Sequence, residues 1–390
     1  MKKLIIKNLG PLSKVKVELG RVNLIIGLQS SGKSCILKTA CHCSWVEKRI
    51  ELIQTAEEFL KGSRFLDALE EYFRMHDFVK PNTYIEYESS FMWFAFDNST
   101  KFFDFHWKPH RWDYHRPKIS YVPSDRNLVA AIPIWSKLPL EYDNLLDFMK
   151  DWDTARKRMG QVENILNTGM SYSYDNASNN DSVILVSGKK IRLSDSSSGI
   201  QSLFPLFVHL GYLFKGQFQL QNESKQTYEQ KEERLRLTKI LANHMNNNKE
   251  ISSFIKENIV PIDGNSYFFS DDLTASRFKG LISRYLNTNH NEIFLEEPED
   301  NLFPPTQCQL IDWLLDCTMI RKRKNMLFMA THSPYVLNQV IKHAPADLHI
   351  FITNPNQKKG LFTVKQLADK EILDVYDNGA DLFFNYEAFV

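Results

Sequence analysis

The chain has 390 residues, of which 43% are hydrophobic and 24% charged, and its formal net charge is +1. This composition is typical of a globular protein with one large α/β core and insertions, or with two domains. The near-zero net charge excludes a global basic field that would attract nucleic acid, although a local basic patch stays open.

The first residues, MKKLIIKNLG, lack the apolar stretch and cleavage site of a signal peptide. The sequence contains no run of about 18 apolar residues, so we expect no membrane span and no membrane partner. Five cysteines without a CxxC pair indicate reduced thiols and a cytoplasmic protein. Cys41, His42 and Cys43 are too close in sequence for a tetrahedral zinc site, so we favour a packing role on a helix.

The period of the hydrophobic pattern predicts the elements of the first part of the chain. Strands are expected at 2–8, 14–19, 22–26, 118–123 and in three aromatic runs within 83–107. Helices are expected from Lys33 to about Leu60, over 55–80 and over most of 138–168. The aromatic runs alternate at strand spacing, which favours packing beside the core over base stacking.

The same patterns extend to the second half. Residues 171–181 (SYSYDNASNND) are polar and rich in turn formers, so a loop is expected there. Residues 216–250 are polar with mixed charges, which suggests an exposed helical arm or a partly disordered insertion. The remaining expected strands are 182–187, 190–193, 292–295, 325–330 and 348–352, and the remaining expected helices are 198–215 and 306–320.

The strand at 22–26 runs directly into the glycine-rich segment GLQSSGKS and then into a helix. In this context consecutive backbone N–H groups wrap phosphates, and the positive end of the helix points at them. Lysine at the seventh position reaches the β and γ phosphates, and the following serine ligates magnesium. The segment predicts ATP binding by Gly27, Gln29, Ser30, Ser31, Gly32, Lys33, Ser34 and Cys35.

The buried strand at 292–295 delivers two acids at its carboxyl end, Glu296 and Glu297. Ligands of α/β sheets sit at this edge. Glu296 would hold the magnesium shell, and Glu297 would orient and deprotonate the attacking water. Taken alone, the two acids could equally form a solvated acidic turn; the phosphate loop in the same chain favours the functional interpretation.

Two further segments have weaker signals. His332 follows the strand at 325–330 and could donate a hydrogen bond to the γ-phosphate, or could be a capping or core histidine. Ser197, Ser198 and Gly199 open the helix at 198–215, where a hydroxyl and amides form another anion site or simply an N-cap.

Taken together and in this order, the four segments resemble the head of ATP-binding-cassette (ABC) ATPases, in particular the SMC/RecF/OLD branch. The resemblance implies an α/β fold with a P-loop, a mixed central sheet flanked by helices, an N-terminal antiparallel β subdomain, and helical and β insertions. It also implies ATP and Mg²⁺ as cofactors.

The resemblance assigns Ser197, Ser198 and Gly199 to the signature and Asp300 and Asn301 to the D-loop. The resemblance implies three catalytic residues, which are Glu297, His332 as the switch histidine, and Lys33. It implies that magnesium is held by Ser34, Glu296 and Asp125. The chain departs from the pattern twice. Glu296 stands where many cassettes have aspartate. The segment Pro123-Ser124-Asp125-Arg126-Asn127 has no Q-loop glutamine. Here Asp125 or Ser124 would approach magnesium, and Arg126 would contact phosphate or brace the site.

The resemblance covers the motifs between residues 27 and 335 and implies a single head over 1–390. Its expected parts are an N-lobe (1–44), an insertion with a β meander (45–117), a Q-loop-like strand with a helical insertion (118–181), the signature region (182–211), a polar helical insertion (212–290), and a lobe with Walker B, D-loop and H-loop (291–390).

The wording EEPE, LFPPTQ and THSPYVLN is similar to stand-alone prokaryotic ATPases of the OLD and anti-phage type, as in PARIS or Septu. The resemblance implies an ATPase that forms a homodimer or a higher homo-oligomer around ATP and controls a separate effector protein. One alternative is a repair or chromosome-type ATPase that clamps nucleic acid, with 321–324 (RKRK) as a DNA contact rather than a solvated helix end. A transporter motor is the other alternative. Scattered acids after Asp369 read as surface charge rather than as a nuclease site.

Overall fold

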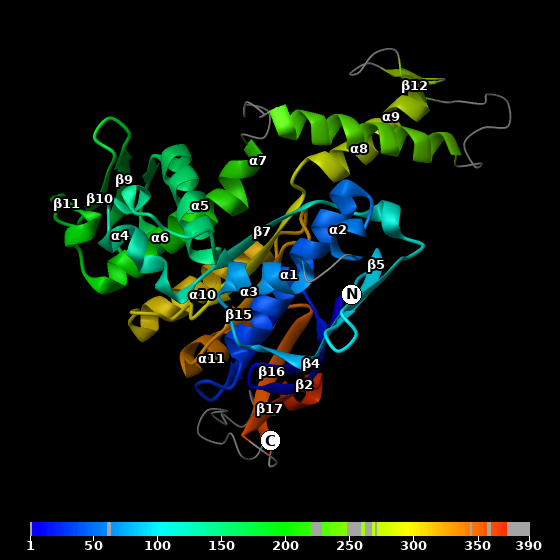
Figure 1. Ribbon diagram of the computed structural model, residues 1–390. Helices are drawn as coiled ribbons and strands as arrows, with labels where there is room; N and C mark the ends of the chain where they lie inside the picture. Colours follow the sequence, from blue (N-terminus) through cyan, green and yellow to red (C-terminus); the bar gives the residue numbers. More distant parts are fainter. Residues whose placement is uncertain are drawn as a thin grey trace.

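The computed structural model describes residues 2–60, 64–219, 228–247, 259–261, 267–269, 271–343, 345–356 and 360–372. One 11-stranded mixed sheet runs through the molecule, and helices flank it (Figure 1), which confirms the expected α/β fold class. Across the sheet the strands are β6 (Phe102–Trp107), β5 (Met92–Asp97), β4 (Val79–Glu88), β1 (Lys2–Leu9), β2 (Leu12–Leu19), β17 (Leu361–Gln366), β16 (Leu348–Asn356), β3 (Val22–Gly27), β15 (Met326–Ala330), β14 (His290–Glu296) and β7 (Pro117–Val122).

Five neighbouring strands, from β16 to β7, are parallel. Their short apolar runs are buried on both faces, and every residue of β3 is buried. Because parallel neighbours end at the same edge, the segments that follow β3, β14, β15 and β7 meet there. The pairing of the strands shows this alignment, because Glu296 on β14 pairs with Ala330 on β15, and Ala330 pairs with Ile25 on β3.

The antiparallel half of the sheet joins β1 and β2 to the hairpin strands β4, β5 and β6. The aromatic runs within 83–107 therefore extend the main sheet, and β4 begins earlier, at Val79. Their inward rings, including Phe94, Phe96 and Phe103, belong to a core cluster, so these rings pack rather than face solvent.

Helix α1 (Lys33–Ile53) lies between the parallel strands and the antiparallel strands, where it packs against both (Figure 1). Cys41 and Cys43 are part of this core, which agrees with the expected packing role. The helix ends before Leu60 because Gln54 adopts a left-handed cap with φ 59°. The chain then continues as α2 (Glu57–Leu60) and α3 (Arg64–Phe73).

The other face of the parallel strands packs against four helices, and their apolar residues form the second core cluster. The helix expected over 138–168 is shorter, because the Asp143 carboxylate caps its start and Gly160 ends it. The four helices are α5 (Asn144–Met159), α6 (Ser198–Gly211), α10 (Pro304–Thr318) and α11 (Pro334–His343).

The loop expected at 171–181 was wrong. This stretch contains β9 (Ser171–Asp175) and the start of β10 (Asn180–Ile184), which pair as a hairpin between β8 (Gln161–Val162) and β11 (Lys190–Arg192). The hairpin follows the alternation of side chains along the strand: Tyr172 is fully buried and packs beside the Trp152 ring, while its neighbours Ser171 and Ser173 are less buried.

The polar segment 216–250 contains α8 (Tyr228–Asn247), and its residues 220–227 and 248–250 lie outside the described residues. The arm is not fully exposed: Leu237 and Leu241 are buried against Leu52 of α1 and Tyr285 of α9 (Asp272–Leu286). Figure 1 shows α8 and α9 projecting together at one end of the molecule. Short strands β12 (Ile259–Pro261) and β13 (Tyr267–Phe269) pair between them.

One residue of the basic cluster at 321–324 makes contacts within the fold. The Arg323 guanidinium donates to the carbonyl oxygen of Phe214 at 2.9 Å and lies 3.6 Å from the ring centroid of Phe218. Of the acids after Asp369, Glu371 pairs with Lys365 at 2.8 Å, whereas 374, 377 and 381 lie outside the described residues. Within the described part of the chain, no helix is long and apolar enough to cross a membrane.

Candidate functional site

The backbone of the loop between β3 and α1 adopts conformations that side chains would obstruct. Gly27 has φ 148°, and a Cβ there would lie 1.8 Å from Oγ1 of Thr353. Gly32 has φ 95°, and a Cβ there would lie 2.7 Å from a methyl carbon of Leu12. Ser30 also has a positive φ, of 59°. These positions explain the glycines of the motif and give the loop its curvature.

A hydrogen-bond chain fixes the loop to the neighbouring strand. The Thr353 hydroxyl on β16 donates to Oγ of Ser31 at 2.6 Å, and the Ser31 hydroxyl donates to the carbonyl oxygen of Leu28 at 2.6 Å. Thr353 lies more than 300 residues from the loop in sequence, so no local pattern identifies it. It is a supporting residue that sequence reasoning missed.

The loop opens onto a pocket of about 250 Å³. Sequence reasoning placed most of its lining at a nucleotide site, and the structure brings those residues together from the loop, β14 and β15. The lining consists of Pro11, Gln29, Ser30, Ser31, Gly32, Lys33, Ser34, Cys35, Phe78, Glu297, Ala330 and His332.

Lys33 is buried at the floor of this pocket. Its ammonium group donates to the carbonyl oxygens of Gly27 at 3.0 Å and Leu28 at 2.7 Å. Burial lowers the pKa of Lys33 to about 8, although the nearby Glu297 and Glu299 carboxylates raise it. The side chain is therefore mainly cationic at neutral pH, as a phosphate ligand requires.

Glu296 ends β14 in a buried position, and Glu297 follows it with a half-exposed side chain. Glu297 has φ 42°, a left-handed conformation that is costly for a residue with a side chain. Its N–H donates to the carbonyl oxygen of Ala330 at 2.8 Å, so strand pairing holds this conformation. Strain of this kind clusters at functional sites, and here it aims the carboxylate at the loop.

The Glu297 carboxylate faces His332, with 3.8 Å between Oε1 and Nε2. Burial, followed by the neighbouring Glu299 and Glu296 carboxylates, raises the pKa of Glu297. Burial and the Lys33 charge lower the pKa of His332. The pair is thus a proton acceptor of raised basicity beside a neutral imidazole.

Glu299 positions the histidine. Its carboxylate accepts from the His332 backbone N–H at 2.6 Å and from the Thr331 hydroxyl at 2.8 Å. The segment after β14 therefore accepts hydrogen bonds at Glu299 from Thr331 and His332, and it donates one from the Glu297 N–H to Ala330 at the end of β15. Sequence reasoning recorded Glu299 within EEPE but gave it no role; a third acid three residues after Glu296 was the available signal.

Arg126 supports the backbone of the two acids, Glu296 and Glu297. It is fully buried and donates to the carbonyl oxygens of Glu296 at 2.9 Å and Glu297 at 2.8 Å. Of the two roles expected for Arg126, this geometry matches the bracing role. Ser124, in the short helical turn η2 (Ser124–Asn127), presents its N–H to the Glu296 carboxylate at 3.4 Å. Asp125 is exposed and outside the pocket lining, so its assignment to magnesium stays a prediction.

Replacing Arg126 by methionine should lower the melting temperature, and it should lower the rate of the ATP hydrolysis that we propose for this site. The substitution removes the donors to the carbonyl oxygens of Glu296 and Glu297, and hydrogen bonds to a charged donor are worth about 1.5–3 kcal/mol each. Differential scanning fluorimetry and a phosphate-release assay measure both effects. Arg192→Met, on the exposed end of β11 (Lys190–Arg192), is the matched control, and equal behaviour of the two variants would contradict the bracing role.

Ser197, Ser198 and Gly199, which were expected to form the signature, do not line the P-loop pocket as the structure describes it. Ser197 stands at the N-cap of α6 and is exposed, and its side chain makes no capping hydrogen bond within the described residues. Gly199 packs against the D-loop of its own chain, where a Cβ would lie 2.9 Å from the carbonyl oxygen of Asn301. The helix start is thus positioned by Asp300-Asn301 and presented outward.

The donor set suits a magnesium nucleotide. The loop residues, the buried Lys33 and Ser34 line the pocket, whereas Glu296 ends β14, two strands from β3, and lies outside the lining. In the described part of the chain, no group of three or more His, Cys, Asp or Glu side chains could hold a metal alone. Mg²⁺ commonly takes one or two protein ligands and completes its shell with waters and phosphates, so this sparse set fits it.

No protein-family model matches the sequence, and no curated protein matches it. Solved structures show remote similarity. The SMC head domain from Thermotoga maritima is 11% identical, over 94% of this chain and 98% of that chain, with a TM-score of 0.41. The Smc head domain bound to the C-terminal domain of ScpA, from Pyrococcus furiosus, is 8% identical over 97% and 99%, with a TM-score of 0.42. The recombination mediator RecF is 11% identical over 94% and 97%, with a TM-score of 0.29. These sequence identities and TM-scores are low.

Proposed function

We propose that this protein is an ATPase of the ABC type, in the SMC/RecF branch, which binds Mg-ATP at the P-loop and hydrolyses it. The observation that carries the proposal is the convergence of Lys33, Glu297 and His332 from three separate segments on one pocket. A phosphate cradle, a carboxylate of raised pKa and a neutral imidazole at one edge of a parallel sheet suit the cleavage of a phosphoanhydride bond.

Each residue has a distinct role in this proposal. The loop amides and Lys33 bind and orient the phosphates, and the His332 imidazole donates a hydrogen bond to the γ-phosphate. Glu297 orients the attacking water and accepts its proton. Magnesium would be held by Ser34 and Glu296 and would supply charge neutralisation on the phosphates.

Magnesium dependence tests the proposal directly. The purified chain should release phosphate from ATP in the presence of Mg²⁺, and chelation with EDTA should abolish the release because the phosphate charge is no longer neutralised. Readdition of Mg²⁺ should restore the rate. Release that persists unchanged in EDTA would contradict a magnesium-dependent ATPase.

The acid limb of the pH profile should lie above the ordinary glutamate value of 4.5, because the pKa of Glu297 is raised. A general base acts only when deprotonated, so a raised pKa moves the loss of activity to higher pH. Measuring kcat/KM against pH locates this limb, and a plateau extending below pH 4.5 in folded protein would remove Glu297 from the role of base.

We further propose that two copies close on ATP and that the signature of one copy completes the site of the other. The P-loop pocket is open on one side, and Ser197 is exposed and does not line the pocket of its own chain. A second copy adding its Ser197 hydroxyl and Gly199 amide would stabilise the γ-phosphate charge and exclude water.

The output of the cycle is proposed as control of a separate effector, a toxin or nuclease, in antiviral defence, with the chain acting as sensor and scaffold. The proposal is motivated by the resemblance of the EEPE and THSPYVLN sequence segments to stand-alone ATPases of the anti-phage type. Co-expression with the neighbouring gene followed by native mass spectrometry tests it, because a stable complex is expected. The alternative, a repair-type ATPase that clamps DNA, predicts duplex binding that weakens steeply with salt.

A further inference from the structure

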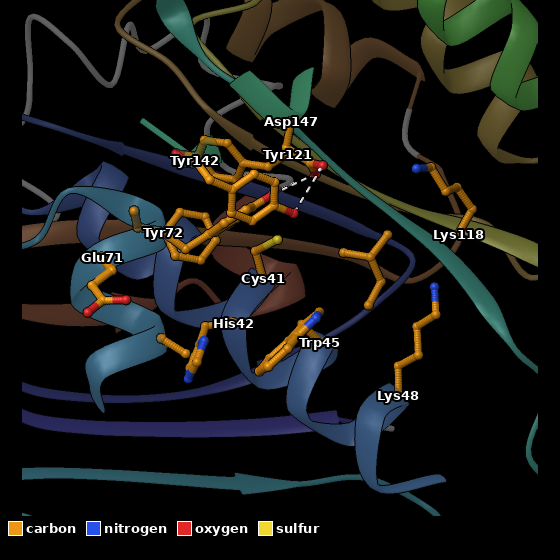
Figure 2. A pocket seen from close by; sticks show the side chains of 13 residues that line it. Cys41, His42, Trp45, Lys48, Glu71, Tyr72, Lys118, Tyr121, Tyr142 and Asp147 are labelled. Carbon is orange, nitrogen blue, oxygen red and sulfur yellow. Dashed lines mark hydrogen bonds between the residues drawn. The ribbon is translucent and has the colours of Figure 1, made fainter. Parts of the chain in front are cut away.

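A second cavity lies farther along α1 than the phosphate loop and is lined by Cys41, His42, Trp45 and Lys48 of that helix. It measures about 390 Å³, which is within the range of roughly 300–1,000 Å³ typical of small-molecule sites. Its walls come from α1, α3, β7 and the start of α5 (Figure 2). No residue of this cavity belongs to the nucleotide motifs.

The cavity is largely aromatic. Trp45 and His42 of α1 are stacked, with ring centroids 5.8 Å apart, and form one wall. Tyr72 and Tyr142 contribute further rings, with centroids 6.0 Å apart. Figure 2 shows these rings around a common space. Flat faces of this kind bind an aromatic ring by stacking and by exclusion of water.

One polar end of the cavity carries two lysines, Lys48 and Lys118. Lys48 is half-buried there and forms no hydrogen bond or ion pair with the residues that the structure describes. The second lysine, Lys118, is paired with Asp151 at 2.6 Å. Burial, followed by the charges of Arg116 and Lys118, lowers the pKa of Lys48 to about 7, although Glu292 and Asp151 raise it. A bound anion would stabilise its charged form.

The two acids of the lining differ in their surroundings. The Asp147 carboxylate accepts from the Tyr72 hydroxyl at 2.7 Å and from the Tyr142 hydroxyl at 3.5 Å. Glu71 is exposed at the rim. His42 is buried, and its Nε2 has no hydrogen-bond partner within the described residues. Burial lowers the pKa of His42 to about 3, so this ring is neutral.

We propose that this cavity binds a small aromatic molecule that carries a negatively charged group, with the ring between Trp45 and the tyrosines and the charge at Lys48. Two sources share this chemistry, a nucleotide with its base and phosphate, and a free aromatic acid.

The cavity shares helix α1 with the P-loop site, and its β7 wall pairs with β14. Helix α1, which carries Trp45 and Lys48, begins at Lys33. Tyr121 of β7 lines the cavity, and burial together with the adjacent Glu296 carboxylate raises its pKa. Occupancy is therefore expected to change the rate of ATP hydrolysis, and this consequence rests on the proposed function.

Binding is tested without ATP, by isothermal titration with three matched probes. The wild-type chain should bind 1-naphthyl phosphate at one site, about tenfold or more tighter than the neutral 1-naphthol and the cationic 1-naphthylmethylamine. Lys48→Met should remove the preference for the phosphate, and Ala68→Trp should fill the cavity and abolish binding of all three probes. The control Lys137→Met, at an exposed lysine, should bind as the wild type does.

Three results would overturn the proposal. They are unchanged affinity in both Lys48→Met and Ala68→Trp, tighter binding of the amine, and loss of phosphate binding in Lys33→Ala, which would place the probe in the P-loop. Displacement by nucleoside monophosphates would assign a nucleotide ligand, and displacement by indole-3-acetate an aromatic acid. Binding that leaves the ATPase rate unchanged would overturn the coupling alone.

Discussion

The Glu297→Gln variant is expected to bind ATP normally and to hydrolyse it at least about a hundredfold more slowly than the wild type. Glutamine keeps the size of the side chain but cannot accept the proton of the attacking water. The left-handed backbone at this position, with φ 42°, is held by the bond to Ala330, so the substitution should leave the fold intact.

Two measurements check this result, single-turnover phosphate release and equilibrium binding of radiolabelled ATP. Because ATP persists in the variant, the closed dimer should accumulate and appear as a doubled mass by size-exclusion chromatography with light scattering. Glu141→Gln, at an exposed glutamate in the loop before α5, is the matched control and should hydrolyse normally. Hydrolysis by Glu297→Gln at the wild-type rate would remove the residue from catalysis.

The Lys33→Ala variant should lose ATP affinity by about a hundredfold or more. The buried ammonium group is the only lysine or arginine among the residues lining the described pocket, and the phosphates carry several negative charges. In the structure Lys33 donates to the carbonyl oxygens of Gly27 and Leu28, so its removal also frees two loop acceptors. Some loosening of the loop is expected with the lost charge.

Fluorescence titration with a labelled ATP analogue measures this affinity. Lys16→Ala, at an exposed lysine of β2, is the matched control for the loss of one positive charge. A thermal melt distinguishes lost binding from lost folding. An affinity in Lys33→Ala equal to that of the control would contradict the assignment of the phosphate loop.

The phosphate loop and the paired acids were predictable because their signals are local. A strand, a glycine-rich turn and a helix follow one another within residues 22 to 53, and the acids directly follow a short apolar run. Parallel pairing then brings the two segments to one edge without further information. His332 was predictable as a candidate for the same reason, since it follows the neighbouring strand.

Long-range contacts were not predictable from one sequence. The hydrogen bond from Thr353 to Ser31 and the donation from Arg126 to the carbonyl oxygens of Glu296 and Glu297 join segments with no shared pattern. The hairpin at 171–184 was missed because turn-forming residues outweighed the two alternating tyrosines. The expected division of the chain into lobes stays a prediction.

The aromatic cavity illustrates the same limit. Trp45 and Lys48 read in sequence as ordinary positions of a long helix, and only the packing of α3, β7 and α5 around α1 places them in one cavity. Chemistry assembled by tertiary structure in this way has no linear motif, and the structure is needed to find it.

The central claim is that each ATP site is shared between two copies of the chain. Mixing two inactive variants tests it most directly. Lys33→Ala has no working P-loop but keeps its signature; Ser197→Glu keeps its P-loop but places a negative charge where the signature would approach the γ-phosphate. Ser197 is exposed, so this substitution should not disturb the fold.

Each variant alone should be inactive in a phosphate-release assay. Random association of equal amounts makes half of the dimers mixed, and each mixed dimer has one intact composite site of two, so the mixture should recover about a quarter of the wild-type rate. If Ser197→Glu alone hydrolyses ATP at the wild-type rate, or if the mixture recovers nothing, the site is not shared between copies.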